Sequence, residues 1–336
     1  MKFGAVPLDH ALGAILAHSV PLPSRRLRKG CMIGPAEIDC LRSAGLVEVT
    51  VAQLDPDDVH EDAAALALAQ ALVPAPVAAG LTLRAVGTGR VNIHADVTGL
   101  AEVLAEQVDA LNAVDPMITL ATVPRWQRMP QGEMVATVKV IAYAVARSAL
   151  DAACAAGVGA LRMRPVAISS AALIQTVTEG DDGEKGHRAI QKRLSALQVQ
   201  MQPKQVVPHR EVELAAALGA VSGADLILIL TASATSDLND VAPQALRRAG
   251  GTVERFGMPV DPGNLLFIGQ LHGRPVIGLP GCAKSPALNG ADWVMERLIC
   301  GVPVTGPDIA AMGVGGLLKE IPIRGRLREP NDKGAG

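Results

Sequence analysis

The chain has 336 residues, of which 49% are hydrophobic and only 2% aromatic, so its cores must be built from Ala, Val, Leu and Ile. A net charge of −2 excludes the strongly basic surface typical of nucleic-acid-binding proteins. The five cysteines are odd in number and have no CxxC spacing, which argues against a disulfide framework or a structural zinc site. A reducing cytoplasm fits this cysteine usage.

The most apolar stretch, residues 63–81, is interrupted by Gln70, Pro74 and Pro76, so we expect no membrane span. The first seven residues lack the basic and then apolar layout of a signal peptide. The length predicts two or three domains. We expect parts at residues 1–73, 74–160 and 161–303, with a partly disordered extension at 304–336.

The first part, residues 1–73, is expected to be α/β. Apolar residues recur at helical spacing in residues 6–19, which predicts a helix. A second helix is predicted at 34–44, followed by a strand at 47–52. The basic residues between the two helices are interpreted as a solvated turn, with guidance of an anion as the alternative.

The second part, residues 74–160, is expected to be a small α+β domain. Alternation around Gly87 and Gly89 predicts a hairpin over residues 81–94. A helix is predicted at 97–113, and strands at 117–123 and 133–142. Lys139 lies in an apolar strand, so its ammonium either points at a ligand or reaches solvent at an edge.

The third part, residues 161–303, carries the features that point to chemistry. A first strand is expected at residues 166–168, and a helix at 187–197. The run at 225–230, which is apolar after Asp225, predicts a strand buried on both faces. Helical patterns on either side of this run make it the central strand of an α/β unit with a parallel sheet.

Small polar residues follow this strand and a second strand at residues 274–279. Because open parallel sheets bind ligands at the carboxyl ends of their strands, both turns are candidates for an anion-binding site. Two ordinary strand-to-helix turns are the alternative interpretation. The candidate ligand-binding residues are Thr231, Ser233, Thr235, Ser236, Pro280, Gly281, Lys284 and Ser285.

The order of these motifs resembles the molybdopterin-binding domain family of molybdenum cofactor biosynthesis, which includes adenylyltransferases, molybdenum insertases and gephyrin. The similarity covers about residues 164–301. Phrases at residues 6–17 and 28–45 resemble the insertase branch in particular. The matching positions are Thr231, Asp240, Pro262–Gly263 and Leu279–Pro280–Gly281.

The resemblance implies a three-layer domain with a mostly parallel sheet, beside smaller N-terminal α+β parts. It also implies molybdopterin, or its nucleotide form, as the bound cofactor. Other cofactor-assembly proteins are implied as partners, and self-association into a homo-oligomer is expected. Neither nucleic acid nor a membrane is expected as a partner, and the expected location is cytoplasmic.

The sequence departs from the family where catalysis would occur. Ala232 and Ser233 replace a glycine pair, which restricts close backbone approach to a ligand. His209 stands where the family has an aspartate, and imidazole is a poor ligand for magnesium. Asp240 is retained and is the candidate catalytic residue.

Asp237 and Asp240 are the candidate magnesium ligands, because carboxylates suit this ion. Capping of the following helix is the alternative role for an aspartate at this place. The acidic loop at residues 179–184 is either a further metal-binding element or an ordinary surface loop.

Three functions follow from these observations. The favoured one is a molybdopterin-binding protein with a degenerate transfer site. The alternatives are an active molybdenumtransferase or adenylyltransferase, and a scaffold that makes protein contacts only.

Overall fold

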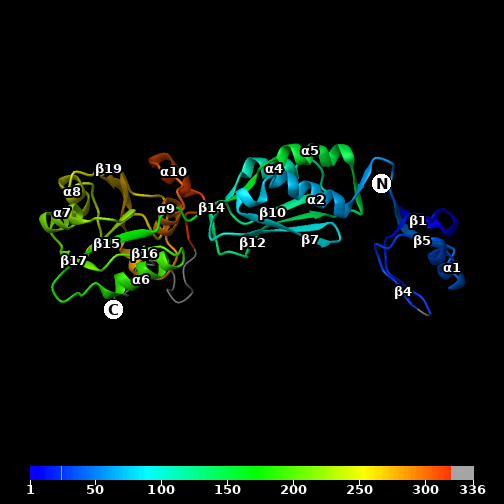
Figure 1. Ribbon diagram of the computed structural model, residues 1–336, viewed down its shortest axis with the longest axis horizontal. Helices are drawn as coiled ribbons and strands as arrows, with labels where there is room; N and C mark the ends of the chain where they lie inside the picture. Colours follow the sequence, from blue (N-terminus) through cyan, green and yellow to red (C-terminus); the bar gives the residue numbers. More distant parts are fainter. Residues whose placement is uncertain (24, 319–336) are drawn as a thin grey trace, which may run out of the picture. The chain divides into compact units, whose positions relative to one another are not determined.

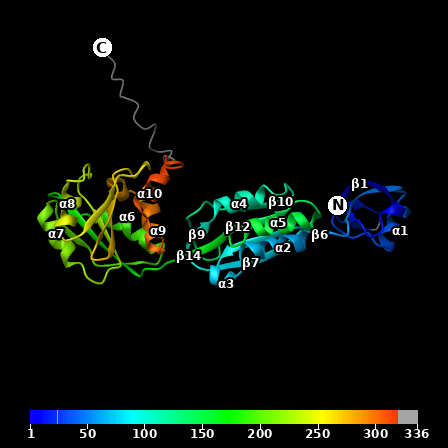
Figure 2. The same cartoon turned by 90° about the horizontal axis from the view of Figure 1, so that it is seen from above.

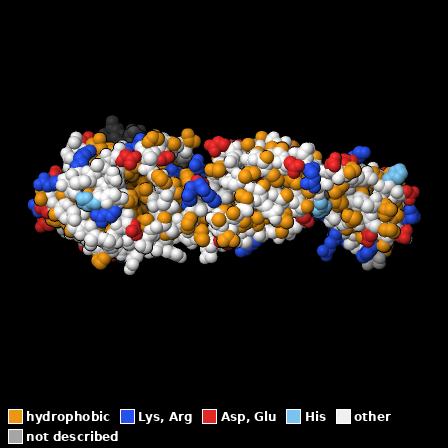
Figure 3. Space-filling model, turned by 45° about the horizontal axis from the view of Figure 1, so that its top comes forward, with side chains coloured by type: hydrophobic (Ala, Val, Ile, Leu, Met, Phe, Trp, Pro, Cys, Tyr) orange, Lys and Arg blue, Asp and Glu red, His pale blue; other side chains and the backbone are white. Residues whose placement is uncertain are grey.

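The computed structural model describes residues 1–23 and 25–318, and the chain divides into two compact units, Met1–Pro165 and Val166–Gly336 (Figure 1). Because the placement of the units relative to one another is not determined, each is described by itself. On the face seen in Figure 3, acidic and basic side chains are scattered among hydrophobic ones.

The first unit begins with an antiparallel sheet in the order β1 (Lys2–Pro7), β5 (Glu48–Gln53), β2 (Ile15–Leu16). The helix α1 (Pro35–Ser43) and the strand β5 confirm the two elements predicted at 34–44 and 47–52. A short hairpin of β3 (Val20–Pro21) and β4 (Arg26–Leu27) lies between β2 and α1 in the chain.

The helix predicted at residues 6–19 is wrong. Lys2 to Pro7 pair with β5 instead, and only a short 3-10 turn, η1 (Leu8–His10), follows. Val6 precedes a proline and is therefore biased toward extended backbone. Gly13 has φ 79°, which a right-handed helix does not accommodate.

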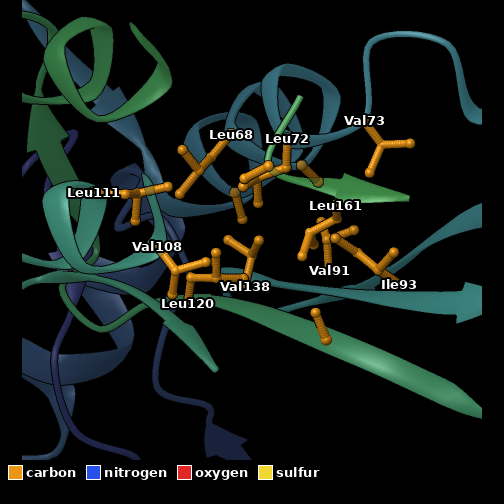
Figure 4. Packing of buried hydrophobic residues seen from close by; sticks show 14 of the residues in the cluster. Leu68, Leu72, Val73, Val91, Ile93, Val108, Leu111, Leu120, Val138 and Leu161 are labelled. Carbon is orange, nitrogen blue, oxygen red and sulfur yellow. The ribbon is translucent and has the colours of Figure 1, made fainter. Parts of the chain in front are cut away.

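The rest of the first unit packs three main helices on strands, and Figure 4 shows part of the apolar core between them. Its sheets have the orders β10-β12-β8-β7 and β11-β9-β14, and β13 pairs with β6. The elements are β6 (Asp58–His60), α2 (Glu61–Leu72), α3 (Pro76–Ala79), β7 (Leu81–Gly87), β8 (Arg90–Ala95), β9 (Gly99–Val103), α4 (Ala105–Asn112), β10 (Ile118–Thr122), β11 (Gln127–Met129), β12 (Met134–Val140), β13 (Ala144–Ala146), α5 (Arg147–Gly157) and β14 (Leu161–Pro165).

The hairpin at 81–94 and the strands at 117–123 and 133–142 are confirmed by β7–β8, β10 and β12. The helix predicted at 97–113 is wrong in its first half, because Gly99–Val103 form the fully buried strand β9. A short buried apolar run cannot be assigned to helix or strand from its periodicity. Lys139 donates to the carbonyl of Thr88 and lies 3.8 Å from the carboxylate of Glu61, so it has partners within the domain.

Helix α2 lies before the boundary expected at residues 73/74, yet it packs against β7, β8 and β12. Its residues Leu68 and Leu72 are fully buried in the same core as Leu111 of α4 (Figure 4). The core of this layer therefore contains residues from β6 to β14.

The second unit contains a mixed sheet in the order β16-β15-β18-β21-β20-β19, with β17 also paired to β15. The pairs of β15 with β16, β17 and β18, and of β18 with β21, are parallel, whereas β20 is antiparallel to both neighbours. The elements are β15 (Ser170–Val177), α6 (Glu184–Ser195), β16 (Gln200–Met201), β17 (Gln205–Pro208), α7 (Glu211–Ala220), β18 (Leu226–Leu230), α8 (Val241–Arg248), β19 (Thr252–Phe256), β20 (Phe267–Leu271), β21 (Arg274–Leu279), η2 (Gly281–Lys284), α9 (Gly290–Ile299), α10 (Gly306–Ala310) and η3 (Ala311–Gly313).

The central strand predicted at 225–230 is confirmed by β18, whose five residues are all buried. Alternate residues of the sheet pack with α7 and α8 in one core, for example Ile227 and Ile229. The opposite face meets α6, because a Cβ added at Gly186 would lie 2.6 Å from Leu230. Helices therefore cover both faces of a mostly parallel sheet, as Figure 2 shows from above.

Two further predictions in this unit need correction. The strand expected at 166–168 is wrong: Ala167 donates to the carbonyl of Ile299, and β15 begins only at Ser170. The sequence also predicts a short helix at residues 311–318, but only the 3-10 turn η3 forms at the start of this range, after α10. The sequence predicts partial disorder for the chain end. Most of the residues that this prediction concerns, 319–336, lie outside the described residues.

Asp225 ties the start of β18 to the start of β15. Its Oδ2 accepts from the backbone N–H of Ser169 at 2.9 Å and of Ser170 at 3.0 Å, and from both serine hydroxyls. The pKa of the Asp225 carboxyl lies below its ordinary value because these groups, the Ser169 N–H foremost, donate to it.

A carboxyl whose pKa is lower in the folded chain stabilises the fold above its unfolded-state pKa of about 3.9, and loses this effect as the pH falls through the folded value. We therefore expect Asp225→Asn to be less stable than wild type near neutral pH by at most about 1 kcal/mol, since the site is exposed. The difference should vanish between about pH 5 and pH 2. Urea unfolding across this range measures it, and a gap that persists at the acid end would contradict the assignment.

Candidate functional site

The carboxyl ends of four strands of the second unit meet at one edge of the sheet. Strands β15, β17, β18 and β21 are linked by parallel pairs, and Val177 at the end of β15 stands opposite Pro208 at the end of β17. His209, the turn at residues 231–240 and the 3-10 turn η2 therefore all leave the sheet at this edge. The two predicted turns belong to one surface.

His209 lies between two hydroxyls. Its Nδ1 is 2.8 Å from Oγ1 of Thr176 on β15, and its Nε2 is 3.0 Å from Oγ of Ser233 after β18. The Thr176 hydroxyl is almost fully buried and also accepts from the backbone N–H of Ala232 at 2.9 Å. These contacts connect three strand ends through one imidazole ring.

The predicted ligand-binding residues of the first turn differ in their roles. Thr231 is buried and donates to the carbonyl of Ser233 at 2.6 Å, so its hydroxyl shapes the turn. Thr235 is also buried, whereas Ser233 and Ser236 are exposed. Of this group, the Ser233 hydroxyl combines exposure with a fixed side-chain partner.

Lys284 of η2 reaches the first turn. Its Nζ donates to the carbonyl of Ala232 at 3.4 Å, which places the ammonium close to the residue that precedes Ser233. The structure thus brings together two residues, Lys284 and Ser233, that are predicted from different strand ends. A cation and an exposed hydroxyl at one edge form a pair of donors suited to an anion.

The two predicted metal ligands serve the turn itself. Asp240 caps α8, since its Oδ1 accepts from Val241 at 2.7 Å and its Oδ2 from Ser236 at 3.0 Å. Asp237 accepts from the N–H of Asn239 at 2.7 Å. Within residues 1–23 and 25–318, no group of three or more His, Cys, Asp and Glu side chains is suited to a metal ion.

The acidic loop before α6 likewise uses its carboxylates internally. Asp181 accepts from the N–H of Gly183 and Asp182 from that of Glu184, both at 2.9 Å. Beneath this loop lies Gln175, a buried side chain that sequence reasoning missed. Its Nε2 donates to the carbonyl of Gly183 at 2.9 Å, while its Oε1 has no hydrogen-bond partner.

Arg193 of α6 fixes the shape of the second turn and was also missed. Its guanidinium pairs with Asp292 of α9, and the two side chains are only 10% and 8% exposed. It donates to the carbonyls of Ala283 at 3.0 Å, Ser285 at 2.8 Å and Ala287 at 3.0 Å. The partners are about a hundred residues apart, so no local sequence pattern reveals them.

The other predicted residues of this turn are held by the same contacts. The Ser285 carbonyl is bound by Arg193, and its hydroxyl accepts from the N–H of Ala287 at 3.3 Å. Pro280 is buried and Gly281 is exposed at the start of η2. Ser285 therefore supports the turn, and Lys284 is its charged group nearest to Ser233.

Comparison with known proteins adds little to this geometry. A family model described as a domain of unknown function (DUF8806) matches residues 5–53. No curated protein matches the chain significantly. A solved structure of the molybdopterin biosynthesis protein MoeA from Pyrococcus horikosii is similar over 89% of this chain and 75% of that one, with 15% identity and a TM-score of 0.32. A likeness this low decides neither fold nor function.

The described residues include no helix that is long and apolar enough to cross a membrane.

Proposed function

We propose that the edge formed by β15, β17, β18 and β21 binds molybdopterin, or its nucleotide form, in the biosynthesis or handling of the molybdenum cofactor. The observation that carries the proposal is the approach of Lys284 to the turn that presents Ser233, at the carboxyl ends of parallel strands. This is where open α/β sheets bind ligands. The resemblance of the turn sequences selects molybdopterin among phosphorylated ligands.

The same geometry favours binding without rapid transfer chemistry. Transfer at a phosphate needs a divalent cation to offset negative charge. Both oxygens of Asp240 accept hydrogen bonds from backbone N–H groups. His209 stands where the resembling family has an aspartate, and its ring contacts Thr176 instead of offering a carboxylate. The active transferase is therefore the less supported alternative. Magnesium-dependent turnover of molybdopterin by the unmodified protein, lost in Asp240→Asn, would establish it instead.

Lys284→Ala is expected to weaken molybdopterin binding about tenfold to a hundredfold, because a charge-assisted contact to the phosphate contributes about 1.5–3 kcal/mol. Anaerobic calorimetry with purified molybdopterin measures the change. Lys192→Ala is the matched control, since this exposed lysine lies in the last turn of α6. Unchanged affinity in folded Lys284→Ala protein would remove the lysine from the site, and no binding by wild type would refute the proposed function.

A further inference from the structure

The contacts around His209 define the direction of its hydrogen bonds. The backbone N–H of Ala232 can only donate, and it donates to Oγ1 of Thr176. The hydroxyl hydrogen of Thr176 then needs an acceptor, because a buried hydroxyl that donates to nothing is costly. Nδ1 of His209, at 2.8 Å, provides that acceptor.

The orientation continues through the imidazole ring. A neutral histidine that accepts at Nδ1 carries its hydrogen on Nε2, so Nε2 donates to Oγ of Ser233 at 3.0 Å. The Ser233 oxygen is thereby an acceptor toward the ring, and its own hydrogen is directed to a different partner. Ser233 is exposed, so its hydroxyl hydrogen is accessible to a partner from solvent at this edge.

We propose that this hydrogen-bond chain, from Ala232 through Thr176 and His209 to Ser233, makes the Ser233 hydroxyl an obligate donor that binds a phosphate oxygen directly, without a divalent cation between them. The inference rests on the proposed function for the place of the ligand and adds the chemistry of the contact. Successive hydrogen bonds polarise one another, which strengthens the last donor in the chain. Lys284 of η2, whose Nζ donates to the carbonyl of Ala232, supplies the positive charge.

The identity of residue 209 decides between two kinds of site. An ionised carboxylate only accepts hydrogen bonds, so one that contacted the Ser233 hydroxyl from this position would direct the Ser233 hydrogen inward. Such a site would offer negative charge to a cation. With histidine at this position, the hydrogen bond between Nε2 and Ser233 runs in the opposite direction. The Ser233 hydroxyl is then free to donate to an anion. His209 is therefore a positioning residue that sets the specificity of Ser233.

The tautomer of His209 tests the chain without any ligand. Protein with ¹⁵N-labelled histidine is examined by NMR at alkaline pH, where the ring is neutral, and the signal is assigned with His209→Gln. We expect the hydrogen on Nε2, and we expect Thr176→Val, which removes the donor to Nδ1, to lose this single tautomer. A hydrogen fixed on Nδ1 in wild type, or an unchanged tautomer in folded Thr176→Val, would overturn the inference.

Binding of inorganic phosphate tests the consequence. Amide shifts are followed during titration with phosphate in the presence of EDTA, and again with magnesium. We expect binding that needs no magnesium, about tenfold weaker in Ser233→Ala and in His209→Asp, and unchanged in Ser222→Ala, an exposed serine of another loop. Acetate in place of phosphate distinguishes a general carboxylate site from a phosphate site, and tighter binding of acetate would contradict the proposal.

The results separate this inference from the proposed function. Phosphate bound only with magnesium, or equally well by Ser233→Ala, would overturn the inference even if molybdopterin binds. The expected tautomer and phosphate binding, together with no affinity for molybdopterin, would support the inference and refute only the proposed ligand.

Discussion

Arg193→Ala is expected to lower the free energy of unfolding of the second unit by about 3–5 kcal/mol. The substitution leaves the carboxylate of Asp292 buried without its partner, and it also removes the donor to three carbonyls of the turn after β21. Buried acceptors that lose their donors keep the full cost of desolvation. Urea unfolding followed by circular dichroism measures the loss.

Arg193→Lys should recover only part of this stability, because an ammonium cannot reproduce the planar fork of donors that reaches several carbonyls at once. Arg188→Ala is the matched control on the same helix. Arg188 is exposed and lies 3.8 Å from Glu184 one turn away, so we expect a change of about 0.5 kcal/mol or less. Equal effects of the Arg193→Ala and Arg188→Ala substitutions would show that the buried contacts contribute nothing.

Leu111→Ala is expected to destabilise the first unit by about 2–5 kcal/mol, since Leu111 is fully buried where α4 meets α5 (Figure 4). Gly157 of α5 faces Leu111 so closely that a Cβ added to the glycine would lie 2.5 Å from Cδ1 of Leu111. Gly157→Ala alone should therefore overpack this core and cost about 1–3 kcal/mol. In the double variant the new methyl group occupies space that the leucine has left.

The double variant should consequently lose about 0.5–3 kcal/mol less stability than the sum of the losses in Leu111→Ala and Gly157→Ala. Urea unfolding of wild type, both single variants and the double variant measures this difference as a double-mutant cycle. Gly219→Ala is the control, because this glycine also lies near a helix end but has nothing within 4 Å of an added Cβ. It should stabilise the chain by up to about 1 kcal/mol through helix propensity. Strict additivity in the cycle would show that the methyl does not enter the space left by Leu111.

The sequence predicts those parts of the fold that local patterns determine. A short apolar run such as Leu226–Leu230, followed by turn residues and flanked by helical patterns, predicts a strand buried on both faces, and β18 has that place. Residues 6–19 show the limit, since an apolar stripe at helical spacing also serves a strand and turn when the partner strand β5 is distant in sequence. The local spacing of apolar residues does not show which distant strand a segment pairs with.

The candidate site has the same limit. The turns that hold Ser233 and Lys284 are recognised from the residues that follow each strand, and the capping role of Asp240 is an alternative visible in the sequence. The contact of His209 with Thr176 depends on the register of β15 against β17, which no motif encodes. The pairing of Arg193 with Asp292 depends in the same way on how α6 and α9 pack.

The division into two compact units has a spectroscopic consequence. The chain has two tryptophans, and each unit contains one of them: Trp126 in the first unit and Trp293 on α9 in the second. A protein of two units need not unfold in a single transition. The indole emission of Trp126→Phe then reports the second unit alone, and that of Trp293→Phe reports the first. The two melting curves of one chain can thus be recorded separately, without dividing the polypeptide.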